Sequence, residues 1–131
     1  MNDIKEELIK KIDSGTLIAG VVGLGYVGLP LAVEKAKAGF KTIGFDLQEA
    51  KVKMVNNGHN YIGDVVDSDL EKLVRSGMLS ATSDFSFVKD VDFIAICVPT
   101  PLDSHQQPDI SYVKSSAESI AKFLKPKTIV V

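Results

Sequence analysis

A short glycine-rich segment, residues 23–28, holds the residue types most able to do chemistry in this sequence. Gly23 permits a tight turn, and Gly25 has no Cβ, so a phosphate could come close to the backbone there. Gly28 allows the chain after the turn to pack closely against the chain before it. If a helix begins here, its free N–H groups and the positive end of its dipole attract phosphates. The segment therefore predicts a site for a phosphate-bearing ligand.

The elements around the glycines make this prediction more specific. Residues 16–22 predict a buried strand before the turn, and residues 27–38 predict a helix after it. Residues 41–46 predict a second strand, which ends on Asp46 at about the offset of 20 residues from the first glycine that dinucleotide-binding units show. Its carboxylate could accept hydrogen bonds from an adenosine ribose and would repel a 2′-phosphate, which favours NAD over NADP. The alternative is a glycine turn that only packs a helix on a strand.

Length and composition are those of one ordinary globular domain. The chain has 131 residues, of which 45% are hydrophobic and 24% are charged, so it can form a core. Its net charge of −2 gives no basic surface, so nucleic acid is not an expected partner. No apolar run is long enough to span a bilayer, so a membrane is not expected either. The single cysteine excludes an internal disulfide and fits the cytoplasm.

Two parts of the chain are expected to fold differently. Apolar residues recur at helical spacing in residues 1–15, which predicts an amphipathic helix. Residues 16–131 alternate strands with helices, which predicts a dinucleotide-binding α/β domain of the Rossmann type, with a doubly wound parallel sheet in three layers. The expected strand order is 3-2-1-4-5, with the ligand crevice at the carboxyl ends of strands 1 and 4. The other expected elements are helices over 48–57, 68–75 and 110–124, and strands over 79–82, 91–98 and 127–131.

The last predicted strand is still running at Val131. A domain seldom stops inside a strand. We therefore expect the sheet to be incomplete at its carboxyl end and the chain to be a piece of a longer protein.

Three further segments have a distinctive sequence. They are NGHNYIGDV after the second helix (57–65), ICVPTPLD at the fourth strand (96–103) and PDISYV at the start of the long helix (108–113). Together with GYVGLPLA in the glycine segment (25–32), they resemble the NAD-binding domain of the UDP-sugar 6-dehydrogenases. That family includes the UDP-glucose, UDP-N-acetylglucosamine and UDP-N-acetylmannosamine dehydrogenases, and the resemblance covers the chain from about residue 16.

The resemblance implies an activity for the longer protein. Such enzymes oxidise C6 of a UDP-sugar to a carboxylate in two NAD-dependent steps, which supplies precursors of polysaccharides. It implies that the nucleophilic cysteine and the groups that assist it lie in a later domain, so no catalytic residue is expected before Val131. It also implies a homodimer or larger assembly. Residues 58–65 and 99–103 look closer to the N-acetyl branch, so a UDP-N-acetylhexosamine is the expected substrate.

The resemblance also implies which residues contact the cofactor. Lys51 is expected at the ribose together with Asp46, although a solvated helix face is its alternative. Thr100 follows the fourth strand between two prolines that stiffen the loop, and a simple turn residue is its alternative. The full set of expected NAD-binding residues is Gly23, Gly25, Tyr26, Val27, Gly28, Asp46, Lys51 and Thr100.

Other residues of chemical interest have simpler interpretations. Cys97 is expected to be a small hydrophobe inside a buried strand. His59 and His105 lie in polar loops without metal-ligand spacing, so no metal site is expected. Tyr61 is either near the active-site cleft, as the resemblance implies, or a core aromatic with its hydroxyl in water. The role of Asp64 is open.

Two other functions share the glycine pattern. One is a dehydrogenase of the hydroxyacid or hydroxyacyl-CoA type, against which residues 57–65 and the Thr100 loop argue. The other is a non-catalytic NAD-binding module, against which the open last strand argues.

Overall fold

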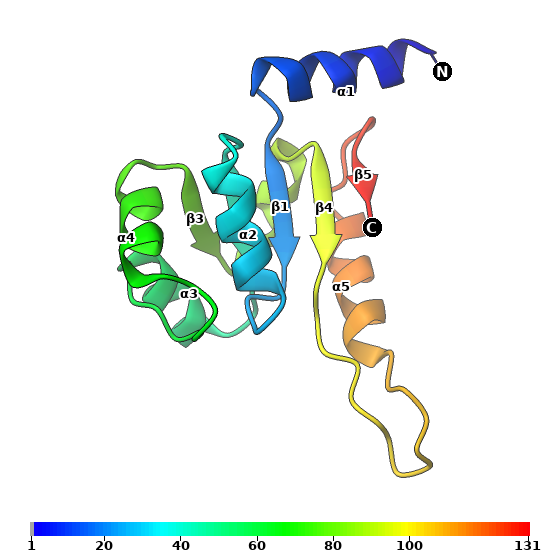
Figure 1. The fold of residues 1–131 in the computed structure, drawn as a ribbon. Coiled ribbons are helices and arrows are strands. Elements are labelled where there is room, and N and C mark those ends of the chain that lie inside the picture. The colour runs from blue at the N-terminus through cyan, green and yellow to red at the C-terminus, as the bar shows by residue number, and fades with distance from the viewer. Residues whose placement is uncertain (1) are drawn as a thin grey trace.

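The fold is built around a five-stranded parallel sheet, in a computed structural model that describes residues 2–131. Its strand order is β3-β2-β1-β4-β5, as the sequence predicts (Figure 1). The strands are β1 Ala19–Val22, β2 Thr42–Phe45, β3 Leu79–Thr82, β4 Phe93–Ile96 and β5 Ile129–Val130. The order reverses between β1 and β4, so the crevice expected for a ligand lies at their carboxyl ends.

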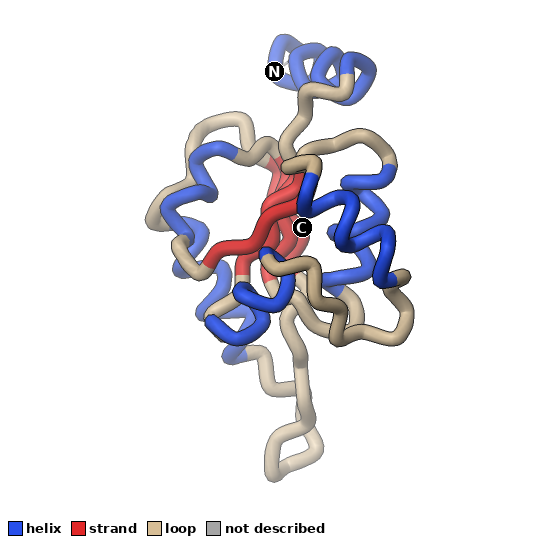
Figure 2. Tube along the Cα trace, turned by 90° about the vertical axis from the view of Figure 1, so that its left-hand side faces the viewer, coloured by secondary structure: helices blue, strands red, loops and turns tan. Residues whose placement is uncertain are grey.

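Two hydrophobic clusters cover the two faces of the sheet, which makes three layers (Figure 2). Neighbouring residues of β1 point to opposite faces, so Val21 belongs to one cluster and Val22 to the other. The helices packed on the first face are α2 Gly28–Lys37, α3 Glu49–Asn56 and α4 Asp67–Arg75. On the second face lie the 3-10 helix η1 Phe85–Asp90 and the helix α5 Ser111–Ala121. The predicted doubly wound Rossmann architecture is therefore confirmed.

The amino-terminal helix α1, Asn2–Ser14, lies beyond the amino ends of the strands (Figure 1). Lys11 connects it to the sheet, because its Nζ lies 2.8 Å from Oδ1 of the buried Asp92. Lys125 reaches the same oxygen at 2.9 Å, and the N–H of Ile18 donates to the other oxygen at 3.0 Å. This cluster lies at the opposite end of the sheet from the crevice.

Most element ends differ by one to three residues from the sequence-based expectation, and the last strand is only Ile129–Val130. Three differences bear on the argument. The first strand begins only at Ala19, because the chain before it bonds back to α1, as Leu17 N–H does to the Lys11 carbonyl. The fourth strand ends at Ile96, so Cys97 lies past its end rather than inside it. The 3-10 helix η1 was not predicted, since two short turns of helix leave no clear periodicity.

Two features are absent from residues 2–131. No helix in that range has the length and apolarity needed to cross a membrane. No group of three or more potential metal-ligating side chains was found within it.

Candidate functional site

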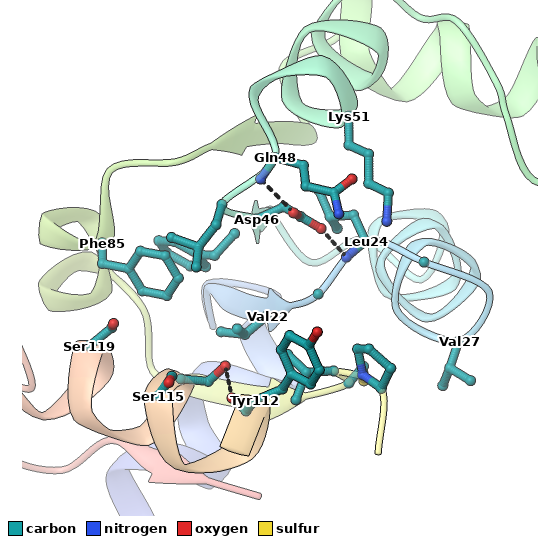
Figure 3. Close-up of a pocket in the computed structure, with 18 of the residues that line it drawn as sticks. Val22, Leu24, Val27, Asp46, Gln48, Lys51, Phe85, Tyr112, Ser115 and Ser119 are labelled. Carbon is teal, nitrogen blue, oxygen red and sulfur yellow. Dashed lines mark hydrogen bonds between the residues drawn. The ribbon is translucent and has the colours of Figure 1, made fainter. Parts of the chain in front are cut away.

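A pocket of about 450 Å³ opens at the carboxyl ends of the central strands (Figure 3). Six parts of the chain line it: the glycine segment after β1, the end of β2, the segment after β4, one face of α5, and single residues of α3 and η1. This is the switch point at which doubly wound sheets bind their ligands.

The three glycines of the loop have different structural roles. Gly23 has φ +95°, and a Cβ there would lie 2.7 Å from the Cys97 carbonyl oxygen, so glycine is required for the fold. A Cβ on Gly28 would overlap the carbonyl oxygen of Gly23, which confirms that α2 packs closely on the turn. A Cβ on Gly25 would have nothing within 4 Å. The space beside Gly25 is therefore open to a ligand, whereas the other two glycines serve the packing.

The loop also presents unused hydrogen-bond donors. Within the part of the chain that the structure describes, the backbone N–H groups of Gly25, Tyr26 and Val27 have no intramolecular acceptor. Val27 is the N-cap of α2, and its side chain caps nothing. The first turn of α2 holds no acidic residue, so no acid of the helix itself opposes an anion at the positive end of the helix dipole. Tyr26 is 82% exposed and Val27 is 67% exposed, which leaves the backbone accessible. The loop can therefore bind a pyrophosphate.

Asp46 is fixed at the mouth of the same pocket. Its Oδ2 accepts the N–H of Leu24 at 2.9 Å, and its Oδ1 accepts the N–H of Gln48 at 2.8 Å (Figure 3). A carboxylate has about four lone-pair sites, so both oxygens can still accept hydroxyl groups of a ribose. Asp46 thus joins the glycine loop to the end of β2 and places a carboxylate at the pocket.

Lys51 and Thr100 differ in their position. The Lys51 side chain extends from α3 toward the glycine loop and lines the pocket (Figure 3). Thr100 is exposed in the loop after β4 and is not among the pocket-lining residues, although the preceding Pro99 is. The structure therefore brings Lys51 together with Asp46 and the glycine loop, and it leaves Thr100 apart from them.

Sequence reasoning missed one wall of the pocket, which α5 and η1 supply. Phe85 packs against Phe45 with ring centroids 5.4 Å apart. The pocket-lining residues of α5 are spaced three or four apart, so they form one polar face of the helix. This spacing could have been recognised from the sequence. Apolar rings and hydroxyl groups of this kind suit a flat heterocycle that also forms hydrogen bonds. The α5 residues concerned are Tyr112, Ser115, Ser116 and Ser119.

Cys97 lines the pocket but has the character of a neutral thiol. It is half-buried and follows β4, and its backbone N–H donates to the Val22 carbonyl at 2.7 Å. Burial raises the pKa of its thiol, and the charge of Lys35 lowers the pKa by less. The expectation that it lies inside a buried strand was wrong, because the strand ends one residue earlier.

Tyr61 fits neither of its two expected environments fully. Its ring packs against the hydrophobic cluster on the α2 face, as a core aromatic would. Its hydroxyl does not face water but donates to the carbonyl oxygen of Leu24 at 2.6 Å. Burial, and to a lesser degree the charge of Asp46, raise the pKa of Tyr61 to about 12, so the hydroxyl keeps its proton at neutral pH. His59, Asp64 and His105 are exposed.

The parallel sheet, the glycine loop at its switch point and the acid at the end of the second strand define a dinucleotide-binding Rossmann domain. Residues 17–131 match the family model described as the UDP-glucose/GDP-mannose dehydrogenase family, NAD binding domain. The chain belongs to this family. NAD is its cofactor, and the hydroxyacid-type alternative is thereby set aside.

Comparison with individual proteins gives the same family. The chain is 40% identical over 111 residues to protein CapL of Staphylococcus aureus, covering 85% of this chain and 25% of that protein. It is 37% identical over 115 residues to the UDP-N-acetyl-D-glucosamine 6-dehydrogenase of Pseudomonas aeruginosa, covering 88% and 26%. The solved GDP-mannose dehydrogenase of Pseudomonas aeruginosa superposes with a TM-score of 0.81 at 29% identity, covering 86% of this chain and 27% of that one. The chain thus spans about a quarter of the length of these relatives.

Proposed function

We propose that this chain is the cofactor-binding part of an NAD-dependent UDP-sugar 6-dehydrogenase, and that its pocket holds NAD(H). The observation that carries the proposal is the open space at Gly25, with three unused N–H groups beside it and the Asp46 carboxylate at the same mouth. In this arrangement the N–H groups bind the pyrophosphate, Asp46 binds the adenosine ribose and Lys51 supports it from α3. Thr100 is assigned to the cofactor on the family resemblance alone.

The substrate side of the proposal depends on the relatives. Several of them are named for N-acetylated sugars, among them UDP-N-acetyl-D-glucosamine 6-dehydrogenase and UDP-N-acetyl-D-mannosamine dehydrogenase. We assign the longer enzyme to a UDP-N-acetylhexosamine and to polysaccharide precursor synthesis on this basis. When bound, NAD accepts a hydride from C6 of the sugar. The residues of this chain bind and orient the cofactor, and they supply no nucleophile, since burial favours the neutral thiol of Cys97.

The proposal includes a location and an assembly. The free thiol of Cys97 fits a reducing cytoplasm. Exposed apolar side chains, among them Ile9, Ile12 and Val131, offer surface that further protein could cover, which agrees with a homodimer or larger assembly of the longer enzyme.

Calorimetry of the chain with NADH tests the cofactor assignment. We expect one saturable site, and adding NADH should raise the melting temperature because the ligand binds only the folded state. The absence of saturable binding would contradict the proposed pocket.

A further inference from the structure

Leu24, the second residue of the glycine loop, is held by three separate contacts. Its N–H donates to Asp46 at 2.9 Å, and its side chain is fully buried beside Gly44, where a Cβ would lie 2.7 Å from Leu24 Cδ2. Its carbonyl oxygen accepts the hydroxyl of Tyr61 at 2.6 Å. The first two contacts hold the residue in place, and the third sets the rotation of the peptide that follows it.

The rotation of that peptide decides where the next donor points. A peptide unit is planar and trans, so the N–H of Gly25 points the opposite way from the carbonyl of Leu24. Tyr61 draws this carbonyl toward the hydrophobic cluster on the α2 face. The N–H of Gly25 therefore points away from that cluster, and within the described residues it has no intramolecular acceptor. Separately, a Cβ on Gly25 would meet nothing within 4 Å, so a ligand can approach this residue.

The loop that carries Tyr61 is itself braced. The side-chain oxygen of Asn60 accepts the N–H of Ile62 at 2.9 Å, and its amide nitrogen donates to Asp67 at 2.8 Å. Ile62 and Val65 are buried in the same cluster. The Tyr61 hydroxyl is consequently held at a fixed place, which a positioning role requires.

We propose that Tyr61 is a positioning residue for the cofactor: its hydroxyl holds the Leu24 carbonyl inward and thereby aims the N–H of Gly25 at the pyrophosphate of NAD(H). This inference rests on the proposed function of the pocket. Tyr61 itself does not line the pocket, so in this proposal it acts through Leu24.

The test compares Tyr61→Phe with a matched control, Thr42→Val. Thr42 is fully buried at the amino end of β2, away from the pocket, and its hydroxyl donates to the Phe40 carbonyl at 2.9 Å. Each variant removes one hydroxyl that donates to a backbone carbonyl and keeps the shape of the side chain, so similar losses in melting temperature are expected. We expect Tyr61→Phe to bind NADH about tenfold more weakly by calorimetry, and Thr42→Val to bind it within about twofold of the parent.

A spectroscopic measurement on the parent protein keeps the test independent of the variant's folding. The ¹H–¹⁵N signal of Gly25 should shift when NADH is added, and Tyr61→Phe should reduce that shift. Equal NADH affinity of the parent and Tyr61→Phe would overturn the inference, as would an equal loss in Thr42→Val. The inference would also be overturned if saturating NADH did not shift the ¹H–¹⁵N signal of Gly25. If the parent binds no NADH, the proposed function itself fails, and this inference fails with it.

Discussion

Asp46 combines two tasks in one side chain, because its oxygens hold two backbone N–H groups while its charge faces the pocket. The charge should set the choice of cofactor. A 2′-phosphate at ~4 Å from a carboxylate meets a repulsion of about 4 kcal/mol at an effective dielectric near 20, before screening by solvent and salt.

We therefore expect the parent protein to bind NADH at least about tenfold more tightly than NADPH. The Asp46→Asn variant keeps a side-chain oxygen acceptor but loses the charge, so the preference should shrink. Glu6→Gln, an exposed site on α1, is the control and should leave the preference unchanged. Calorimetry with both cofactors measures the ratio, and equal affinity of the parent for the two would contradict the role of Asp46.

The glycines give a second prediction at this scale. Gly25→Val adds side-chain atoms in open space, so it should fold with nearly the stability of the parent and lose NADH binding, because the valine occupies the space of the pyrophosphate. Gly28→Val places its side-chain atoms against the Gly23 carbonyl, so it should cost at least about 3 kcal/mol of unfolding free energy. Urea unfolding and NADH titration of both variants make the comparison. If Gly25→Val is as unstable as Gly28→Val, Gly25 is needed for packing and not for access of the pyrophosphate.

At the residue scale, the sequence was enough to predict that the glycines and Asp46 lie together at the pocket, while their roles toward NAD stay a prediction. The glycine spacing and Asp46 could be recognised because their positions relative to the strands are regular. The role of Tyr61 could not, since its partner is a backbone carbonyl and any residue at position 24 would present the same atom. Cys97 was misplaced for a related reason, because an apolar run does not mark the residue at which strand pairing ends.

At the scale of elements, apolar runs and glycine breaks were enough to predict the sheet order. The expected helix over 68–75 is observed as α4, and the last helix as α5, with shifts of a few residues at their ends. What sequence patterns did not reveal is the short η1, whose start depends on one side chain: Asp84 accepts the N–H of Ser86 at 2.9 Å. Such a local cap is weak evidence before the structure is known.

The contact between α1 and the sheet predicts a dependence on pH. Burial alone would raise the pKa of Asp92, but the Ile18 N–H and the ammonium groups of Lys11 and Lys125 outweigh burial and hold it at about 2, below its usual 3.8. A lowered pKa in the folded state means that the unfolded chain binds the proton more readily. Asp92 therefore stabilises the fold above about pH 3.8, and this contribution is lost as the pH falls toward 2.

Asp92→Asn should consequently cost about 2 kcal/mol of unfolding free energy at pH 7 and much less near pH 2. Asp90→Asn is the matched control, because Asp90 lies two residues away and is exposed. Urea unfolding of the parent and both variants at the two pH values measures the difference. An Asp92→Asn cost that does not change between them would contradict this account of the cluster.

At the scale of the whole molecule, the proposed function gives this chain one wall of a reaction site. The chain spans about a quarter of the length of its relatives. The pocket residues proposed to bind the cofactor include Cys97, whose thiol has its pKa raised by burial. Hydride transfer requires the sugar C6 to be held within about 3–3.5 Å of the nicotinamide, which demands groups that bind the sugar on the other side of the cofactor.

We therefore expect the 131-residue chain to bind NADH and yet to oxidise no UDP-sugar. The purified chain is incubated with NAD and, in turn, UDP-glucose, UDP-N-acetylglucosamine, UDP-N-acetylgalactosamine and UDP-N-acetylmannosamine, and NADH absorbance is followed. NADH binding by the same preparation is the control that the pocket is intact. If no turnover is seen, the cause is then the absence of catalytic groups and not unfolding of the chain. Sustained turnover with any of these sugars would place the catalytic groups within residues 1–131. It would contradict the proposal that this chain binds the cofactor and supplies no nucleophile. The complementary experiment uses the longer enzyme of the proposed function, in which turnover should appear, with an N-acetylated sugar preferred.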